Sequence, residues 1–165
     1  MRKTLFFLLL VSFATASYAQ NYQLHSVYIY SFIRYIQWPE DDSPEFVIGV
    51  LGDSPILPHL QKMAEVKKAG DRKIVIKLFN NTGDITPCAM LFKAKESEVL
   101  LEEIMPLLNG GHTMLITEED GLATEGSNIN FVLKDSKLVF ELNSQAMEKS
   151  NLKVSTELTR LAVVI

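Results

Sequence analysis

The chain has 165 residues, 47% of them apolar, and a formal net charge of -4 at pH 7. A chain of this length suits one domain that can bury a sizeable core. The acidic balance disfavours DNA or RNA as a partner, because nucleic-acid-binding proteins usually carry a basic stripe and excess positive charge.

The first segment, MRKTLFFLLLVSFATASYAQ, has the layout of a secretory signal peptide. Two positive residues open it, an apolar run over residues 5–13 follows, and small residues precede a plausible cleavage point. The run is shorter than the about 20 residues that span a bilayer. We therefore expect a signal peptide over residues 1–19, cleaved near Ala19, and an exported, periplasmic domain over residues 20–165 with no transmembrane segment. The alternative is an uncleaved N-terminal anchor.

Residues 22–38 show the periodicity of an amphipathic helix and hold four of the five tyrosines and the single tryptophan. Pro39 is expected to end this helix, because it disfavours the helical region for the residue before it. The crowded aromatics fit a core stripe, a ligand cage or a membrane anchor. Most of them share the apolar arc, which favours core packing, whereas Tyr30 and Trp38 fall outside it.

Short apolar runs then alternate with amphipathic segments, and continuous apolar runs are typical of strands covered on both faces. The strands are expected at 46–51, 73–79, 88–93 and 113–117. The helices between them are expected to start at Asp53-Ser54-Pro55, ending near Ala69, and at Ser97, ending near Leu108.

The last third of the chain predicts a hairpin and two helices. Strands over residues 129–133 and 138–142 flank a turn over 134–137. A short helix over 143–149 and a final helix over 154–165 follow, and the apolar residues of the final helix are expected to be buried. The whole pattern predicts an α/β fold: a single-domain sandwich, a mixed sheet with flanking helices, a C-terminal hairpin and a final helix.

No motif in the sequence indicates catalytic residues, a cofactor or a metal site. The turn over residues 49–54 lacks the glycine spacing of nucleotide-binding loops, and His25, His59 and His112 lack the spacing of metal ligands. Cys88 is the single cysteine, so it cannot form an intramolecular disulfide, and its apolar surroundings favour an inert thiol. We expect no enzyme, although a site assembled from scattered residues stays open.

A small ligand, if the domain binds one, is expected at the carboxyl ends of the strands, where open α/β sheets bind their ligands. Asp53 and Ser54 follow one predicted strand there, and Thr117 and Glu118 end another. We predict that a small polar ligand contacts these four residues.

A partner surface is predicted on the first helix. Tyr30 and Arg34 lie on its polar side, and Trp38 stands at its end. Tyrosine, arginine and tryptophan are enriched at binding hot spots. We therefore predict that Tyr30 and Arg34, with Trp38 at the edge, bind a partner or a second copy of the chain. The alternative is that a neighbouring loop or the hairpin covers them.

Several short motifs occur in a specific order along the chain. They are Trp38-Pro39, Ile48-Gly49-Val50-Leu51-Gly52, Ile129-Asn130-Phe131, Val139-Phe140-Glu141-Leu142-Asn143 and Leu152-Lys153-Val154-Ser155. In this order and spacing they resemble the YfiR-like family of small exported bacterial proteins, and the resemblance covers nearly the whole mature chain.

The resemblance implies a non-enzymatic periplasmic regulator that takes part in cyclic-di-GMP signalling. The characterised member binds the periplasmic part of a membrane-bound diguanylate cyclase and holds it inactive. By resemblance, we expect this chain to bind and modulate a membrane-bound signalling protein of the diguanylate cyclase or sensor kinase type, and a homodimer stays open. The alternative function is a periplasmic small-molecule-binding protein. The characterised member has several cysteines and responds to redox conditions, whereas Cys88 alone excludes an intramolecular disulfide switch here.

Overall fold

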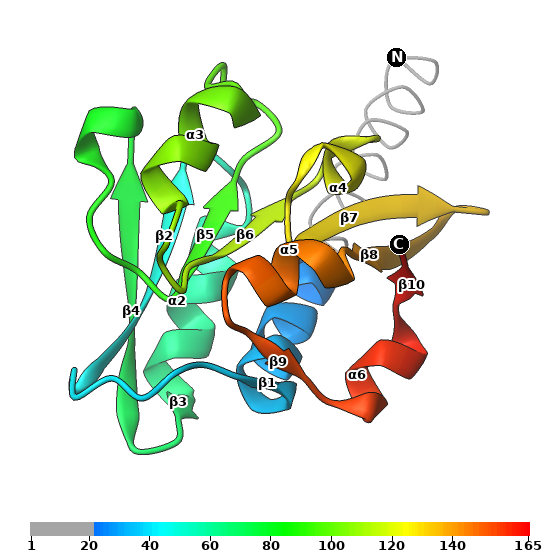
Figure 1. The fold of residues 1–165 in the computed structure, drawn as a ribbon. Helices are drawn as coiled ribbons and strands as arrows, with labels where there is room; N and C mark the ends of the chain where they lie inside the picture. The colour runs from blue at the N-terminus through cyan, green and yellow to red at the C-terminus, as the bar shows by residue number, and fades with distance from the viewer. Residues whose placement is uncertain (1–21) are drawn as a thin grey trace, which may run out of the picture.

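The computed structural model describes residues 22–165 and shows the expected mixed α/β sandwich (Figure 1). The signal peptide expected over residues 1–19 lies outside this part of the chain. In spatial order, the strands of the main sheet are β10 (Val163–Val164), β8 (Lys137–Leu142), β7 (Ile129–Lys134), β6 (Met114–Thr117), β5 (Met90–Lys93), β2 (Glu45–Leu51), β4 (Arg72–Phe79) and β3 (Lys68–Ala69). A second, two-stranded sheet pairs β1 (Ile36–Gln37) with β9 (Lys153–Val154).

The helices flank the main sheet. They are a first helix over residues 22–35, α2 (Leu57–Val66), α3 (Leu101–Leu108), α4 (Leu122–Glu125), α5 (Ser144–Lys149) and α6 (Thr156–Leu161), with a short 3-10 turn, η1 (Thr82–Asp84).

The centre of the sheet is parallel, and its connections change direction next to β2. Strands β4, β2, β5, β6 and β7 run parallel, and β8 returns antiparallel to β7 as the predicted hairpin. The chain passes from β2 to β4 on one side and then to β5 on the other. Open α/β sheets place ligands beyond the carboxyl ends of the strands at such a reversal.

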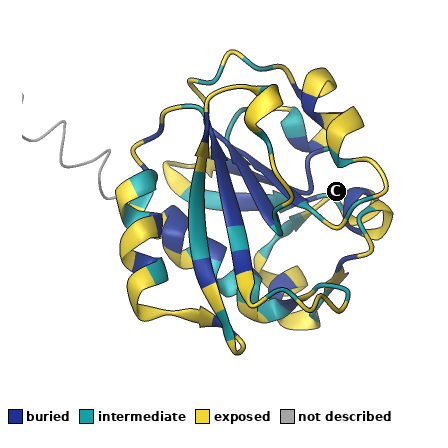
Figure 2. Cartoon of the chain, turned by 90° about the vertical axis from the view of Figure 1, so that its left-hand side faces the viewer, coloured by how far each residue is buried: buried dark blue, intermediate teal, exposed yellow. Residues whose placement is uncertain are grey.

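Two apolar clusters lie on opposite faces of the sheet. Alternate residues of β2 face one or the other, so Ile48 joins the cluster that holds Phe32 and Leu60, from the first helix and α2. Leu51 joins the cluster that holds Leu101 and Ile104, from α3. In Figure 2 the buried residues gather on the sheet and on the inner sides of the helices. The sheet is therefore covered on both faces, as its continuous apolar runs predict.

The first helix ends at residue 35, three residues earlier than predicted. The next two residues, Ile36 and Gln37, pair with Val154 and Lys153, and the backbone N–H of Ser155 donates to the carbonyl of Tyr35 at 2.9 Å. Pairing with a distant strand therefore ends the helix before Pro39 can.

The predicted final helix is wrong in its bounds, and of its apolar residues only Leu158 is fully buried. Six residues form α6, and residues 163–164 form β10, which runs parallel to β8. Leu161, Val164 and Ile165 are 65%, 47% and 43% exposed. An edge strand turns its side chains to alternate sides, so backbone pairing, rather than side-chain burial, fixes this segment.

Removal of residues 163–165 should weaken the domain without unfolding it. The Ile165 N–H donates to the Leu142 carbonyl at 3.0 Å, and the Ser144 N–H donates to the Ile165 carbonyl at 3.2 Å. Net contributions of about 0.5–1.5 kcal/mol per hydrogen bond predict a loss of about 1–3 kcal/mol in the free energy of unfolding. Urea unfolding followed by circular dichroism measures this loss. Leu161→Ser, at an exposed position, is the control; absence of a cooperative transition in the shortened chain would contradict the expectation.

Candidate functional site

A polar cluster, here called the Glu118 cluster, lies at the carboxyl ends of the central strands. It consists of Tyr22, His25, the backbone of Lys95 and Glu118. The Tyr22 hydroxyl donates to Glu118 Oε1 at 3.5 Å, and the Lys95 backbone N–H donates to the same oxygen at 2.9 Å. His25 Nε2 lies 3.7 Å from Glu118 Oε2. One carboxyl group therefore joins the first helix, the segment after β5 and the end of β6.

The environment of Glu118 favours its protonated form. Its side chain is only 6% exposed. Burial raises the pKa of this carboxyl to about 7; the Lys95 N–H opposes the rise and the charge of Glu96 adds to it. Burial, followed by the nearby charge of Glu118, raises the pKa of Tyr22 well above its usual value. The cluster can therefore gain or lose a proton near neutral pH.

The four residues predicted to contact a small ligand are only partly brought together. The Ser54 hydroxyl lies near Tyr22, where it favours the ionised phenol, so Ser54 and Glu118 face the same group. Asp53 is exposed. Thr117 is buried, and its hydroxyl donates to Asn130 Oδ1 at 2.8 Å instead. The ligand site proposed for these four residues stays a prediction.

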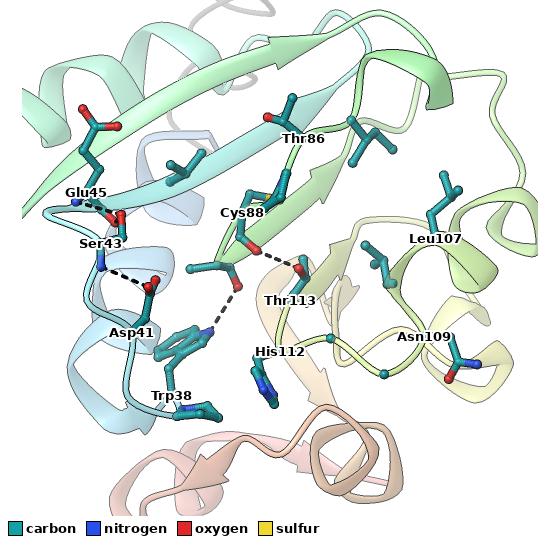
Figure 3. Close-up of a pocket in the computed structure, with 18 of the residues that line it drawn as sticks. Trp38, Asp41, Ser43, Glu45, Thr86, Cys88, Leu107, Asn109, His112 and Thr113 are labelled. Atoms are coloured by element: carbon teal, nitrogen blue, oxygen red, sulfur yellow. Dashed lines mark hydrogen bonds between the residues drawn. The ribbon is translucent and has the colours of Figure 1, made fainter.

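A second candidate site, here called the amino-end cleft, opens at the opposite ends of the strands. It has a volume of about 790 Å³. Figure 3 shows Trp38 and Asp41 on one side, Leu107 and Asn109 on the other, and Cys88 between them. Leu107 belongs to the end of α3, and the other four residues come from separate segments that precede the strands. No local motif joins these residues, so the sequence alone does not indicate this cleft.

The side chains of the amino-end cleft are held in place. Trp38 Nε1–H donates to the Ala89 carbonyl at 3.1 Å, and its ring meets the Phe46 ring edge-on, with centroids 5.1 Å apart. The Thr113 hydroxyl donates to the Cys88 carbonyl at 2.6 Å. Burial raises the pKa of the Cys88 thiol to about 11, which agrees with an unreactive thiol.

The predicted partner surface has one freely exposed member. Arg34 is exposed, with its guanidinium 5.5 Å from the Tyr35 ring centroid. Tyr30 is half-buried against the core, and Lys67 Nζ lies 5.3 Å from its ring centroid. Trp38 is half-buried in the amino-end cleft. Whether these residues bind a partner stays a prediction.

Among residues 22–165, no group of three or more histidine, cysteine, aspartate or glutamate side chains is arranged to hold a metal ion. No helix in the same range has both the length and the apolar character needed to cross a bilayer.

The family model described as DUF4154, YfiR/HmsC-like, matches residues 22–163. The chain belongs to the YfiR/HmsC-like family. The resemblance seen in the sequence is therefore confirmed. No curated protein matches the chain. The YfiR/HmsC-like proteins are a family of periplasmic regulators.

The motif residues of this YfiR/HmsC-like chain hold its C-terminal third together. Asn130 and Glu141 are opposite each other in the β7–β8 pair, and Asn130 Nδ2 donates to Glu141 Oε2 at 3.1 Å. Asn143 Oδ1 accepts the Ala146 N–H and caps α5. Ser155 Oγ accepts the Leu158 N–H and caps α6. These motif residues therefore have a structural role in the C-terminal third of the chain.

Proposed function

We propose that this chain is an exported, non-enzymatic regulator. It binds the periplasmic part of a membrane-bound signalling protein, of the diguanylate cyclase or sensor kinase type, and modulates its activity. The observation that carries the proposal is the family match over residues 22–163. The signal-peptide pattern over residues 1–19 supports export, because a regulator of this kind has to reach the same compartment as its target.

The outer side of the first helix is the proposed contact surface. Val27, Tyr30 and Arg34 are three and four residues apart, which places them along one stripe of the helix. Val27 is 55% exposed and Arg34 is exposed. Lys67, the first residue after α2, lies with its Nζ 5.3 Å from the Tyr30 ring centroid, so the stripe continues to the end of a second helix. Tyrosine and arginine, the residue types of Tyr30 and Arg34, are among those enriched at binding hot spots.

The proposal is tested by capture from solubilised membranes, with the purified chain as bait, followed by binding and activity measurements. A retained signalling protein is identified by mass spectrometry, and its periplasmic domain is titrated with the chain by calorimetry. The activity of the intact membrane protein, as cyclic-di-GMP formation or autophosphorylation, is measured with and without the chain. An activity that does not change on saturation with the chain would overturn the proposed function.

Arg34→Glu should weaken this association by at least about tenfold and leave the thermal midpoint unchanged, because Arg34 is exposed. The matched control is Lys134→Glu, the same charge change at an exposed residue of the hairpin. Tyr30→Ala is a poorer probe, since Tyr30 also packs against the core. Equal affinities of Arg34→Glu and Lys134→Glu for the partner would show that the contact surface does not include Arg34.

The second candidate function is binding of a small molecule as the whole activity. The amino-end cleft favours it, because its volume of about 790 Å³ lies in the range of ligand sites. Mass spectrometry of small molecules that the purified chain retains from a periplasmic extract, followed by calorimetry with each of them in the absence of any protein partner, distinguishes this candidate from the first.

A further inference from the structure

The amino-end cleft has the walls of a ligand site. Side chains with apolar surface line much of it: Trp38, Val47, Ile85, Pro87, Leu107 and Leu108. Trp38 is fixed by its hydrogen bond to Ala89 and by the edge of Phe46. The apolar walls are therefore formed before a ligand arrives, which lowers the conformational entropy that binding would cost.

Three polar donors of the cleft, from Trp38, Thr113 and Arg72, already have partners within the protein. The Trp38 indole N–H is donated to the Ala89 carbonyl, and the Thr113 hydroxyl is donated to the Cys88 carbonyl. Arg72 Nη1 donates to Asp41 Oδ2 at 3.4 Å, and its guanidinium lies 5.0 Å from the Phe46 ring centroid. A ligand that needs strong hydrogen-bond donors would have to compete with these contacts.

The acceptors of the cleft are less fully used. Three carboxylates line it, from Glu40, Asp41 and Glu45, against one guanidinium, from Arg72. The Asp41 side chain is 60% exposed, so it keeps lone pairs free besides those used by Arg72 and the Ser43 N–H. Figure 3 places Asp41 beside Trp38, so an anionic group and an aromatic ring are neighbours on the same side of the cleft.

His112 adds a further acceptor. Its Nδ1 lies 3.2 Å from the Ser150 carbonyl oxygen, which can only accept a hydrogen bond. Nδ1 therefore carries the proton, and in the neutral ring Nε2 is left as an acceptor. The Cys88 thiol stays neutral at neutral pH, because burial raises its pKa to about 11, so it adds no charge to the cleft.

We propose that the amino-end cleft binds a small organic amine in its protonated form. The ammonium group donates to Asp41, and the apolar body of the amine packs on Trp38 and the α3 side of the cleft. A cation next to Asp41 is also attracted by the neighbouring indole ring. The inference goes beyond the proposed regulator function and needs no partner for its test.

The test uses the fluorescence of Trp38, the single tryptophan of the chain, in the purified protein. The probes are phenethylamine and 3-phenylpropionate, which share the aromatic body and differ in the charge of the end group. Phenethylamine should produce a saturable change, and 3-phenylpropionate should bind at least about tenfold more weakly. Absence of a saturable change with phenethylamine, or equal affinities for the two probes, would overturn the proposal.

Two variants locate the binding. Asp41→Asn keeps the oxygen that accepts the Ser43 N–H but removes the charge, and it should weaken phenethylamine binding by at least about fivefold. Asp135→Asn removes the same charge from the exposed hairpin turn and should leave the affinity within about twofold. Leu107→Lys, at an exposed residue of the cleft wall, should also weaken phenethylamine but not 3-phenylpropionate. If Asp41→Asn and Leu107→Lys both bind phenethylamine like Asp135→Asn, the amine does not occupy this cleft.

Discussion

Phe32→Ala should lower the free energy of unfolding by about 3–5 kcal/mol, which is the usual cost of removing a buried phenylalanine ring. Phe32 is fully buried, and its ring centroid lies 5.9 Å from that of Phe131 and 5.1 Å from that of Phe140. Alanine would leave a cavity between the first helix and the β7–β8 hairpin. Because a domain of this size is stable by only about 5–15 kcal/mol, the loss is a large fraction of its free energy of unfolding.

Urea unfolding at neutral pH measures this effect. Val27→Ala is the matched control, because it lies on the same helix with its side chain facing solvent, and it should change stability by less than about 0.5 kcal/mol. A loss below about 1 kcal/mol for Phe32→Ala would mean that the aromatic crowding of the first helix has a role other than core packing.

Glu118→Gln should make the domain more stable than the wild type at pH 8 and similar to it near pH 4.5. The pKa of Glu118 is about 7 in the folded chain and 4.5 for an unperturbed carboxyl. Because folding raises this pKa, the group contributes its full stability below about pH 4.5, and the contribution is lost as pH rises through 7. The shift corresponds to at most about 3 kcal/mol, since one pKa unit is about 1.4 kcal/mol.

Glutamine keeps an oxygen that can accept the Lys95 N–H and cannot ionise, so it avoids that loss. The free energy of unfolding is measured from pH 4.5 to 8 for the wild type, Glu118→Gln and the control Glu125→Gln, at an exposed position. His25, Tyr22, Glu96 and Lys95 surround the carboxyl in the wild type and in Glu118→Gln alike, so the difference between them reports the ionisation of Glu118 together with its interaction with His25. A stability difference that stays constant over this pH range would contradict the expectation.

The central part of the fold could be predicted because burial on both faces of the sheet requires a local pattern of apolar residues in the sequence. The continuous apolar run in β2 and the amphipathic pattern of the first helix follow from this burial. The two-residue strands β1, β9 and β10 have no such pattern, because their extended conformation depends on pairing with strands that are distant in the sequence. For the same reason the final helix was predicted too long.

The candidate sites could be predicted only where a general rule of the fold brings distant residues together. Ser54 and Glu118 were expected at the same edge of the sheet, because the carboxyl ends of parallel strands meet there. Tyr22 and His25 of the first helix also contact Glu118. The apolar pattern of that helix does not indicate that a carboxylate lies next to these two side chains. The amino-end cleft is assembled from loops, strand ends and the end of α3, which are far apart in the sequence, so no spacing rule could reveal it.

The β1–β9 pairing joins the two surfaces for which ligands are proposed. His112, on the wall of the amino-end cleft, contacts the carbonyl of Ser150, and the chain then enters β9 and donates from Ser155 to Tyr35, beside Arg34. The proposed amine site and the proposed protein surface are therefore connected by one continuous series of hydrogen bonds and chain segments, from His112 through β9 to the first helix. Any coupling free energy between them is reciprocal: the factor by which the protein changes the amine's affinity equals the factor by which the amine changes the protein's. Titrating the amine in the presence of the protein, or the protein in the presence of the amine, yields the same change in affinity.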